Sequence, residues 1–201
     1  MKVAIVNFPG TNCERDSKYA FDKLGCETQI IWHKEIDINA DLIVLPGGFS
    51  HGDYLRTAAI AKFSPVMKAV LAHAARGGYI LGICNGFQML LELGLLAGAM
   101  NKNINLSFIS KFHNLRVVSN DNKFLHCCDK GEILNIPIAH GEGNYYASAD
   151  TLKSLYDEDC VLLKYCDAKG ADLNPNGSVD AIAGICDKNK KIFGLMPHPE
   201  R

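Results

Sequence analysis

The chain has 201 residues, of which 48% are hydrophobic and 21% charged, and its formal net charge at pH 7 is −1. This composition is typical of an ordinary globular protein with a sizeable core. Without a dense Lys/Arg cluster, the near-neutral charge argues against nucleic acid or an anionic membrane as the main partner. No run approaches the roughly 20 apolar residues of a membrane span.

The eight cysteines do not follow a disulfide or zinc pattern. No C-x-x-C pair occurs, and the first apolar run begins almost at Met1, with no secretory signal before it. We therefore expect mostly reduced thiols in a cytoplasmic protein that holds no metal.

The first half of the chain alternates between strand and helix signals. Gly25 and the pair Gly77-Gly78 end two of the helices, and Ser64-Pro65 restarts one of them. The pattern predicts strands at 2–8, 28–32, 41–45 and 79–83, and helical segments at 11–24, 54–76 and 85–93.

The second half has more strand signals, and antiparallel hairpins are expected among them. The pattern predicts strands at 104–109, 114–118, 123–127, 133–138, 161–166, 181–186 and 192–196, and one helix at 151–157.

This order of elements predicts an α/β fold. We expect a doubly wound, mainly parallel sheet with helices on both faces, extra antiparallel strands in the second half, and a single domain over residues 1–201. Active sites in such sheets lie at the carboxyl ends of the strands.

The segment around Cys84 is the strongest functional signal. A β-prone run enters Gly82-Ile83-Cys84-Asn85-Gly86, and an apolar helical run leaves it. This is the Gly-x-nucleophile-x-Gly elbow with cysteine as the nucleophile. Backbone N–H groups and the helix dipole at such a turn favour a thiolate and, later, an oxyanion. A small buried cysteine at a strand end is the alternative reading.

A base for this nucleophile is expected near the C-terminus. His198-Pro199-Glu200 follows a predicted strand, and residues two apart on extended backbone face the same side. Glu200 is therefore placed to orient His198. An exposed Pro-rich tail remains the alternative.

Several other residues are candidates for substrate contacts. Gly47-Gly48 can turn a backbone N–H towards the sulfur, and together with the N–H of Asn85 this would form an oxyanion hole, although a plain Gly-Gly turn is the alternative. His140 and Glu142 lie in a Gly-rich segment that is suited to approach a ligand, although a loop histidine is an equal reading. Asp53 and Arg56 are either ligand contacts or solvated surface charges.

Together these segments resemble the class I (triad) glutamine amidotransferases, and within them the glutaminase subunits of phosphoribosylformylglycinamidine synthase. The segments that carry the resemblance are residues 7–14, 46–56, 82–88, 139–143 and 194–201. The family pattern continues past Arg201, and it usually has an aromatic residue at the position of His51.

The resemblance implies roles for individual residues. Cys84 is expected to be the nucleophile, His198 the general base and acid, and Glu200 the orienting carboxylate. It also implies an oxyanion hole at Gly48 and Asn85, with Gln88 near the glutamine pocket.

The resemblance further implies a reaction and partners. Glutamine is expected to give glutamate through a thioester, and ammonia to pass to a large synthetase subunit that converts formylglycinamide ribonucleotide to formylglycinamidine ribonucleotide in purine biosynthesis. A third, very small subunit is expected in the complex. ATP and Mg²⁺ are expected on the synthetase, and no cofactor on this chain.

Two alternatives remain from the residues alone. An independent γ-glutamyl cysteine hydrolase shares the elbow. A non-catalytic thiol sensor of related fold also shares it, but relies on an acidic residue near the thiol.

Overall fold

The computed structural model describes residues 1–201 and is built around one large mixed sheet. Nine strands lie in the order β2-β1-β3-β4-β11-β10-β9-β6-β7, and a small separate sheet pairs β5 with β8. The strands are β1 (Lys2–Asn7), β2 (Glu27–Trp32), β3 (Leu42–Leu45), β4 (Tyr79–Ile83), β5 (Ala99–Asn101), β6 (Ile109–Val117), β7 (Ile133–His140), β8 (Asn144–Tyr146), β9 (Val161–Cys166), β10 (Ile182–Cys186) and β11 (Ile192–Leu195).

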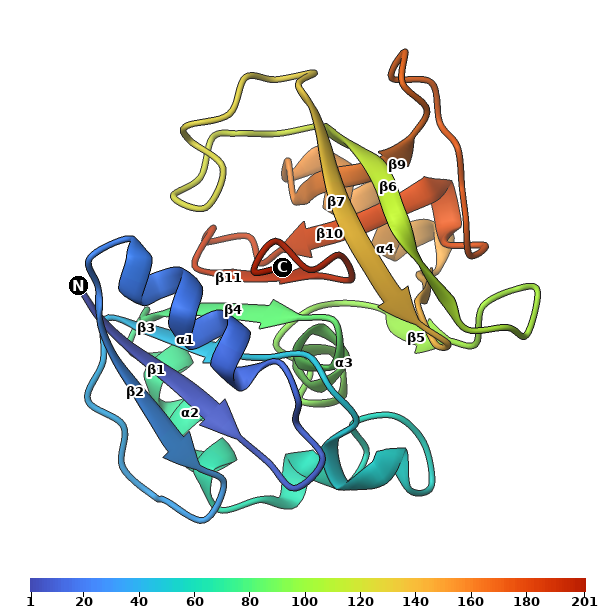
Figure 1. The fold of residues 1–201 in the computed structure, drawn as a ribbon. Coiled ribbons are helices and arrows are strands. Elements are labelled where there is room, and N and C mark those ends of the chain that lie inside the picture. Colours follow the sequence, from blue (N-terminus) through green and yellow to red (C-terminus); the bar gives the residue numbers. More distant parts are fainter.

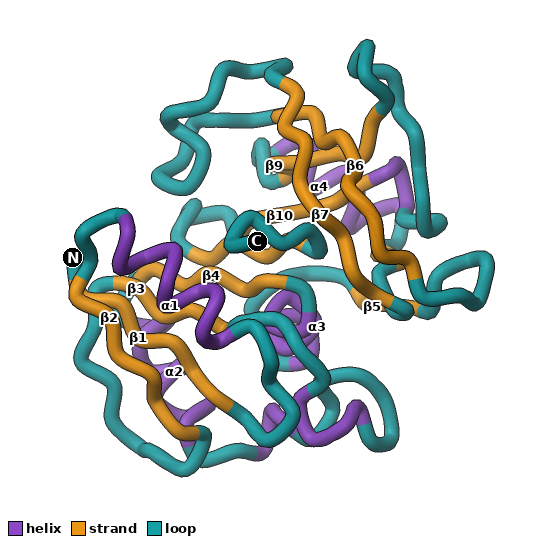
Figure 2. Tube along the Cα trace, viewed as in Figure 1, coloured by secondary structure: helices purple, strands orange, loops and turns teal.

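Helices cover both faces of the parallel part of the sheet (Figure 1). Helix α1 lies on one face, and α2 and α3 lie on the other, while α4 lies beside the antiparallel strands (Figure 2). The helices are α1 (Glu14–Lys23), α2 (Val66–Ala75), α3 (Asn85–Glu92) and α4 (Ala149–Asp157), with short 3₁₀ turns η1 (Ser50–Asp53), η2 (Ala61–Phe63) and η3 (Val179–Ala181).

The pairing confirms the predicted α/β fold and divides the sheet into two parts. Strands from β2 to β11 pair in parallel, whereas pairing from β11 to β7 is antiparallel. Strand β3 is buried along its whole length, as expected for a parallel strand covered on both faces.

Two predicted strands are turns instead, apart from Ile109, which begins β6, because asparagine side chains bond to the backbone there. At 104–109, Asn105 Oδ1 accepts from the Ser107 N–H at 3.1 Å, and Leu106 has φ +54°. At 123–127, Asn122 Oδ1 accepts from two successive N–H groups, at 2.9 and 2.8 Å. Such side-chain bonds offer the backbone an alternative to a strand ladder.

The helical segment predicted over 54–76 is also shorter than expected. Leu55 and Ala58 have positive φ values, which no right-handed helix accepts, so α2 begins only at Val66. Strands β5 and β8 were not predicted; each has only three residues and lies outside the main sheet.

The parallel strands bring distant parts of the chain to one edge of the sheet. The segments after β1, β3, β4 and β11 all leave from their carboxyl ends, and they carry Cys13, Gly48, Cys84 and His198 respectively. An isolated bridge between Thr11 and Gly48 joins the first two segments. The C-terminal segment turns back beside α1 (Figure 1).

One hydrophobic core runs through both halves, from Val3 to Met196. The single domain over residues 1–201 stays a prediction. None of the helices is both long and apolar enough to pass through a membrane.

Replacing Gly86 with alanine is expected to destabilise the fold by more than about 3 kcal/mol. A Cβ at this position would lie 1.8 Å from the Leu45 carbonyl oxygen, and neither backbone can yield without moving β3 or α3. Thermal unfolding of the purified variant measures the loss. The control is Gly141→Ala, whose Cβ would meet only Phe108 Cδ2, at 3.7 Å; equal unfolding temperatures for the two variants would contradict the prediction.

Candidate active site

Cys84 lies at a strained bend between β4 and α3. Its φ of 50° and ψ of −105° are unusual for a residue with a side chain, and the residue is 6% exposed. Gly82 and Gly86 make the bend possible, since a Cβ on either would lie within 3 Å of neighbouring atoms. The sharp strand-to-helix bend that the sequence predicts at Cys84 is thus present, and the role of Cys84 as a nucleophile stays a prediction.

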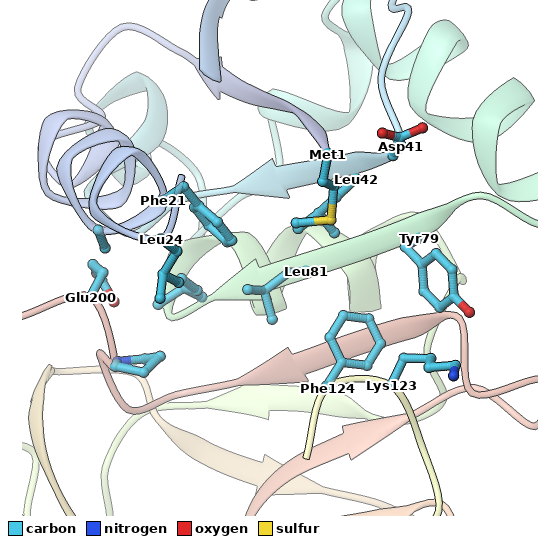
Figure 3. Close-up of a pocket in the computed structure, with 13 residues that line it drawn as sticks. Met1, Phe21, Leu24, Asp41, Leu42, Tyr79, Leu81, Lys123, Phe124 and Glu200 are labelled. Atoms are coloured by element: carbon cyan, nitrogen blue, oxygen red, sulfur yellow. The ribbon is translucent and has the colours of Figure 1, made fainter. Parts of the chain in front are cut away.

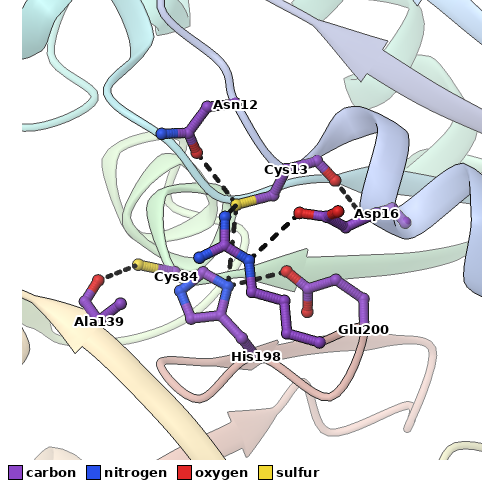
Figure 4. A network of polar contacts seen from close by, with 9 residues as sticks. Asn12, Cys13, Asp16, Cys84, Ala139, His198 and Glu200 are labelled. Atoms are coloured by element: carbon purple, nitrogen blue, oxygen red, sulfur yellow. Dashed lines mark hydrogen bonds and ion pairs between the residues drawn. The ribbon is translucent and has the colours of Figure 1, made fainter. Parts of the chain in front are cut away.

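A backbone hydrogen bond couples the elbow to the strand that carries the histidine. The Cys84 N–H donates to the Leu195 carbonyl oxygen at 2.8 Å, and the His198 N–H donates to the Pro137 carbonyl oxygen at 2.9 Å. These bonds hold both residues against the main sheet. Figure 4 shows the His198 ring between Cys84 and Glu200.

His198 and Glu200 form a buried pair. The His198 Nδ1 lies 2.8 Å from Glu200 Oε1, and both side chains are 3% exposed. Burial lowers the pKa of His198, but contacts with Cys13, Cys84 and Glu200 outweigh it and raise the pKa above its usual value. The imidazole therefore holds a proton strongly once it has received one, and no hydrogen-bond partner in the protein occupies its Nε2.

Cys13 is a second thiol at this imidazole that the sequence analysis did not single out. Its Sγ lies 3.9 Å from His198 Nδ1 and 3.1 Å from Nη2 of Arg201, which also bonds to Asp16 at 3.2 Å. Its position just beyond β1, at the same carboxyl edge as the elbow, is the signal that could have found it.

Cys13, His198 and Glu200 are also the only group of side chains arranged to hold a metal ion. Their ligand atoms lie within 4.8 Å of one another. The His198–Glu200 contact uses the same Nδ1 and carboxylate, so a metal here would compete with that pair.

Two backbone N–H groups without a backbone acceptor belong to residues near Cys84. Asn85 provides the first N–H of α3, which has no acceptor within the helix. The Gly48 N–H makes no backbone hydrogen bond, and Gly48 lines the same cavity as Cys84. Gly47 must lack a side chain, because a Cβ there would lie 2.6 Å from His198 Cε1. Gly48 and Asn85 thus lie near Cys84, and their role as oxyanion donors stays a prediction.

A cavity of about 220 Å³ opens beside Cys84 and includes the predicted pocket residue Gln88. Gln88 Nε2 donates to the Glu142 carbonyl oxygen at 2.6 Å, and its Oε1 accepts from Asn85 Nδ2 at 2.9 Å. The full lining is Gly48, Phe49, Asp53, Thr57, Cys84, Gln88, Phe108, Ala139, His140, Gly141 and Glu142.

His140 is neutral in this cavity, and its tautomer follows from its neighbours. Asn103 Oδ1 accepts from the Gly143 N–H at 3.0 Å, so the His140 Nδ1, 3.1 Å from the same oxygen, carries a proton and donates it. Burial and the nearby His198 lower the pKa of His140 to about 4. Its buried Nε2 is therefore an acceptor, and it has no partner in the protein. No pattern in the sequence identified Asn103.

Arg56 takes no part in this arrangement. Its guanidinium forms two hydrogen bonds with Glu92, at 2.9 and 2.7 Å, on the surface. Of the two surface-charge candidates, only Asp53 lines the cavity.

A larger cavity of about 710 Å³ lies beside α1 and is mostly apolar (Figure 3). Phe21 of α1 and Leu24, which follows the helix, line it together with Leu81 and Phe124, and Glu200 also lines it. Cys84 does not line it, so a substrate attacked by the sulfur has to occupy the smaller cavity.

The family model of the CobB/CobQ-like glutamine amidotransferase domain matches residues 1–201. The chain is 69% identical over its whole length to the phosphoribosylformylglycinamidine synthase subunit PurQ of Campylobacter jejuni, covering 87% of that protein. It is 61% identical to the PurQ of Sulfurimonas denitrificans, covering 91%.

A solved structure agrees with these sequences. A chain in the structure of PurLQS from Thermotoga maritima superposes with a TM-score of 0.89 at 40% identity, and the match covers all of this chain and 88% of the other. The full-length match to the family model and the high identity to the curated relatives show that this chain belongs to the CobB/CobQ-like glutamine amidotransferase family and, within it, to the PurQ subunits of phosphoribosylformylglycinamidine synthase.

Proposed function

We propose that this chain hydrolyses the side-chain amide of glutamine at Cys84 and delivers the ammonia to a synthetase subunit. There the ammonia replaces the formamide oxygen of formylglycinamide ribonucleotide, giving formylglycinamidine ribonucleotide at the expense of ATP. The observation that carries the proposal is the strained Cys84 elbow. It lies beside the buried His198–Glu200 pair and lines the cavity of about 220 Å³. The PurQ relatives supply the class of reaction.

The residues support a two-stage acyl transfer. His198 takes the thiol proton, and the sulfur attacks the amide carbon of glutamine. The oxygen then becomes an oxyanion, which the N–H groups of Gly48 and Asn85 stabilise, each donor contributing roughly 3 kcal/mol. The intermediate collapses to a thioester as His198 returns the proton to the leaving nitrogen, which departs as ammonia.

Water completes the cycle through the same groups. His198 takes a proton from water, the resulting hydroxyl attacks the thioester, and glutamate leaves as the proton returns to the Cys84 sulfur. Glu200 holds Nδ1 throughout, which keeps Nε2 directed at the reacting atoms and stabilises the charged ring.

The partners follow from the same proposal. A large synthetase subunit binds the nucleotide substrate, ATP and Mg²⁺, and a third, very small subunit completes the assembly. Support comes from the similarity of this protein to one chain of the PurLQS structure. Thioester formation and its hydrolysis need no cofactor on this chain.

Trapping with a glutamine-mimicking diazoketone tests the proposal. The thiol displaces dinitrogen from the reagent and forms a stable thioether, so one equivalent is expected on Cys84, with loss of glutamine-dependent synthesis in the complex. The exposed Cys127 serves as an internal control, because it is accessible but lies outside the cavity. Modification of Cys127 in place of Cys84, seen by peptide mapping, would count against the proposed site.

A further inference from the structure

Three side chains of the kinds that bind metals meet on the Nδ1 side of the His198 ring. The Cys13 sulfur lies 3.9 Å from His198 Nδ1, which lies 2.8 Å from Glu200 Oε1, and all three ligand atoms lie within 4.8 Å of one another. Figure 4 shows Cys13 and Glu200 on this side of the ring and Cys84 on the other. The cluster is therefore separate from the thiol that is proposed to attack glutamine, although both share one imidazole.

The spacing and chemistry of these atoms suit a zinc ion. Four-coordinate zinc has bonds of about 2.0 to 2.3 Å, which place its ligand atoms roughly 3.3 to 3.8 Å apart. The separations of 3.9 and 2.8 Å lie close to this range, so shifts of roughly half an ångström would complete three of the four positions. A thiolate, an imidazole and a carboxylate are all zinc ligands, whereas Mg²⁺ prefers an octahedron of oxygen atoms. The cluster therefore favours a thiophilic ion over Mg²⁺.

Burial and an oxygen without a partner both indicate a ligand at this cluster. Cys13 and His198 are 1% and 2% exposed, and the Glu200 side chain is 3% exposed. Glu200 Oε1 contacts His198, but its buried Oε2 has no partner in the protein. A buried carboxylate oxygen without a partner is costly, so the fold leaves an acceptor that a cation would satisfy.

Arg201 is the group that an ion has to displace. Its Nη2 lies 3.1 Å from the Cys13 sulfur, and its Nε lies 3.2 Å from Asp16 Oδ2. Because the Arg201 side chain is 38% exposed, the guanidinium can turn into solvent. Zinc is bound by the thiolate, so the thiol proton must also leave. These two costs favour a reversible site over a permanent structural one.

We propose that Cys13, His198 and Glu200 bind Zn²⁺ reversibly and that the bound ion switches off glutamine hydrolysis. The ion uses the Nδ1 lone pair, so the one proton left on the ring lies on Nε2. A protonated Nε2 cannot take the proton of the Cys84 thiol, and the ion also draws the Glu200 carboxylate away from the ring. The switch rests on the proposed function, whereas the binding site does not.

Spacing in the sequence did not reveal this site, and no metal was expected on this chain. Cys13 and His198 are 185 positions apart, so no short motif joins them. The ion inhibits the reaction and takes no part in it, so the expectation of no cofactor is unchanged.

Cobalt binding to the full chain tests the site without any measurement of activity. Co²⁺ can take the place of Zn²⁺, and a thiolate ligand gives a sulfur-to-cobalt charge-transfer band. We expect one equivalent of thiolate-bound Co²⁺ that Zn²⁺ displaces, retained in Cys84→Ala and lost in Cys13→Ser, which keeps the size of the side chain. Glu200→Gln should weaken Co²⁺ binding by about 10-fold or more, because an amide replaces a charged ligand.

Cys127→Ala is the matched control, because this exposed thiol also lies beside an imidazole, 3.3 Å from His126 Nε2. It should bind Co²⁺ as the wild type does. Loss of the band in Cys84→Ala or Cys127→Ala, or its persistence in Cys13→Ser, would place the ion elsewhere and overturn the site. A wild-type chain without thiolate-bound Co²⁺ would overturn it as well. Unchanged affinity in Glu200→Gln would overturn the role of that carboxylate.

The switch is tested in the assembled complex with two nitrogen sources. Zn²⁺ should inhibit glutamine-dependent synthesis and leave ammonium-dependent synthesis unchanged at the same concentration. In Cys13→Ser, with each rate taken relative to its zinc-free value, the Zn²⁺ concentration for half inhibition should rise at least about 30-fold.

The outcomes separate the switch from the proposed function. Equal Zn²⁺ sensitivity of the wild type and Cys13→Ser would overturn the switch. Equal inhibition with both nitrogen sources would place the ion on the synthetase and overturn it too. A wild-type complex that uses no glutamine would overturn the proposed function, and the cobalt band would still decide the binding site.

Discussion

Replacing Cys84 with alanine is expected to lower glutamine-dependent synthesis by the complex on the order of 10⁴-fold or more. The sulfur is the only group at the elbow that can form the thioester, and the neighbouring residues cannot substitute for it. Synthesis from ammonium salts should continue at the wild-type rate, because the synthetase then receives ammonia directly. The measurement is product formation with each nitrogen source in the reconstituted complex.

Cys127→Ala provides the matched control, since this exposed cysteine lies outside the cavity. It should leave both activities unchanged. Glutamine use that survives in the Cys84→Ala complex at a tenth of the wild-type rate or more would exclude the sulfur as the nucleophile. Parallel loss of the ammonium-dependent activity would instead indicate a defect in assembly.

Strong local patterns made the elbow and the parallel half of the sheet predictable. Gly82 and Gly86 flank Cys84 at positions where a Cβ would collide with neighbouring atoms, and the turn lies between an apolar strand and an apolar helix. Because the carboxyl ends of parallel strands share an edge, Gly48 and Cys84 could be placed together from the sequence alone.

The missed elements depended on side-chain hydrogen bonds that hydrophobic periodicity does not report. Asn105 and Asn122 each bond to nearby backbone N–H groups and turn two apolar segments away from strand structure. The sequence of residues 104–109 still looks like a strand by composition. The turn that this segment adopts depends on the Asn105 side chain and on the left-handed conformation of Leu106.

The missed site residues depended on contacts between distant parts of the chain. Cys13 and His198 are 185 positions apart and meet only because β1 and β11 end at the same edge of the sheet. For Asp53 the sequence left two readings open, a ligand contact or a surface charge, and the β7–β8 turn, which brings Glu142 beside it, makes it a cavity residue. Neither contact follows from spacing in the sequence.

Replacing His198 with alanine is expected to lower glutamine-dependent synthesis about as far as the loss of the sulfur does, because the two groups act as one unit. The chain offers no replacement base. His140 is the other imidazole lining the cavity, but its pKa is lowered to about 4 and its Nδ1 proton is engaged by Asn103, so it accepts hydrogen bonds and is a poor base near pH 7.

The pH profile separates loss of the base from loss of the fold. Without His198, ionisation of the sulfur depends on hydroxide, so the residual rate and the rate of diazoketone labelling should rise steadily with pH. In the wild type, the imidazole takes the proton and makes both rates less dependent on pH. Glu200→Gln should give a smaller loss than His198→Ala, because the base remains and only its charged partner is removed. Equal losses in these two variants, together with unchanged pH profiles, would mean that this buried pair serves the fold and not the proton transfer.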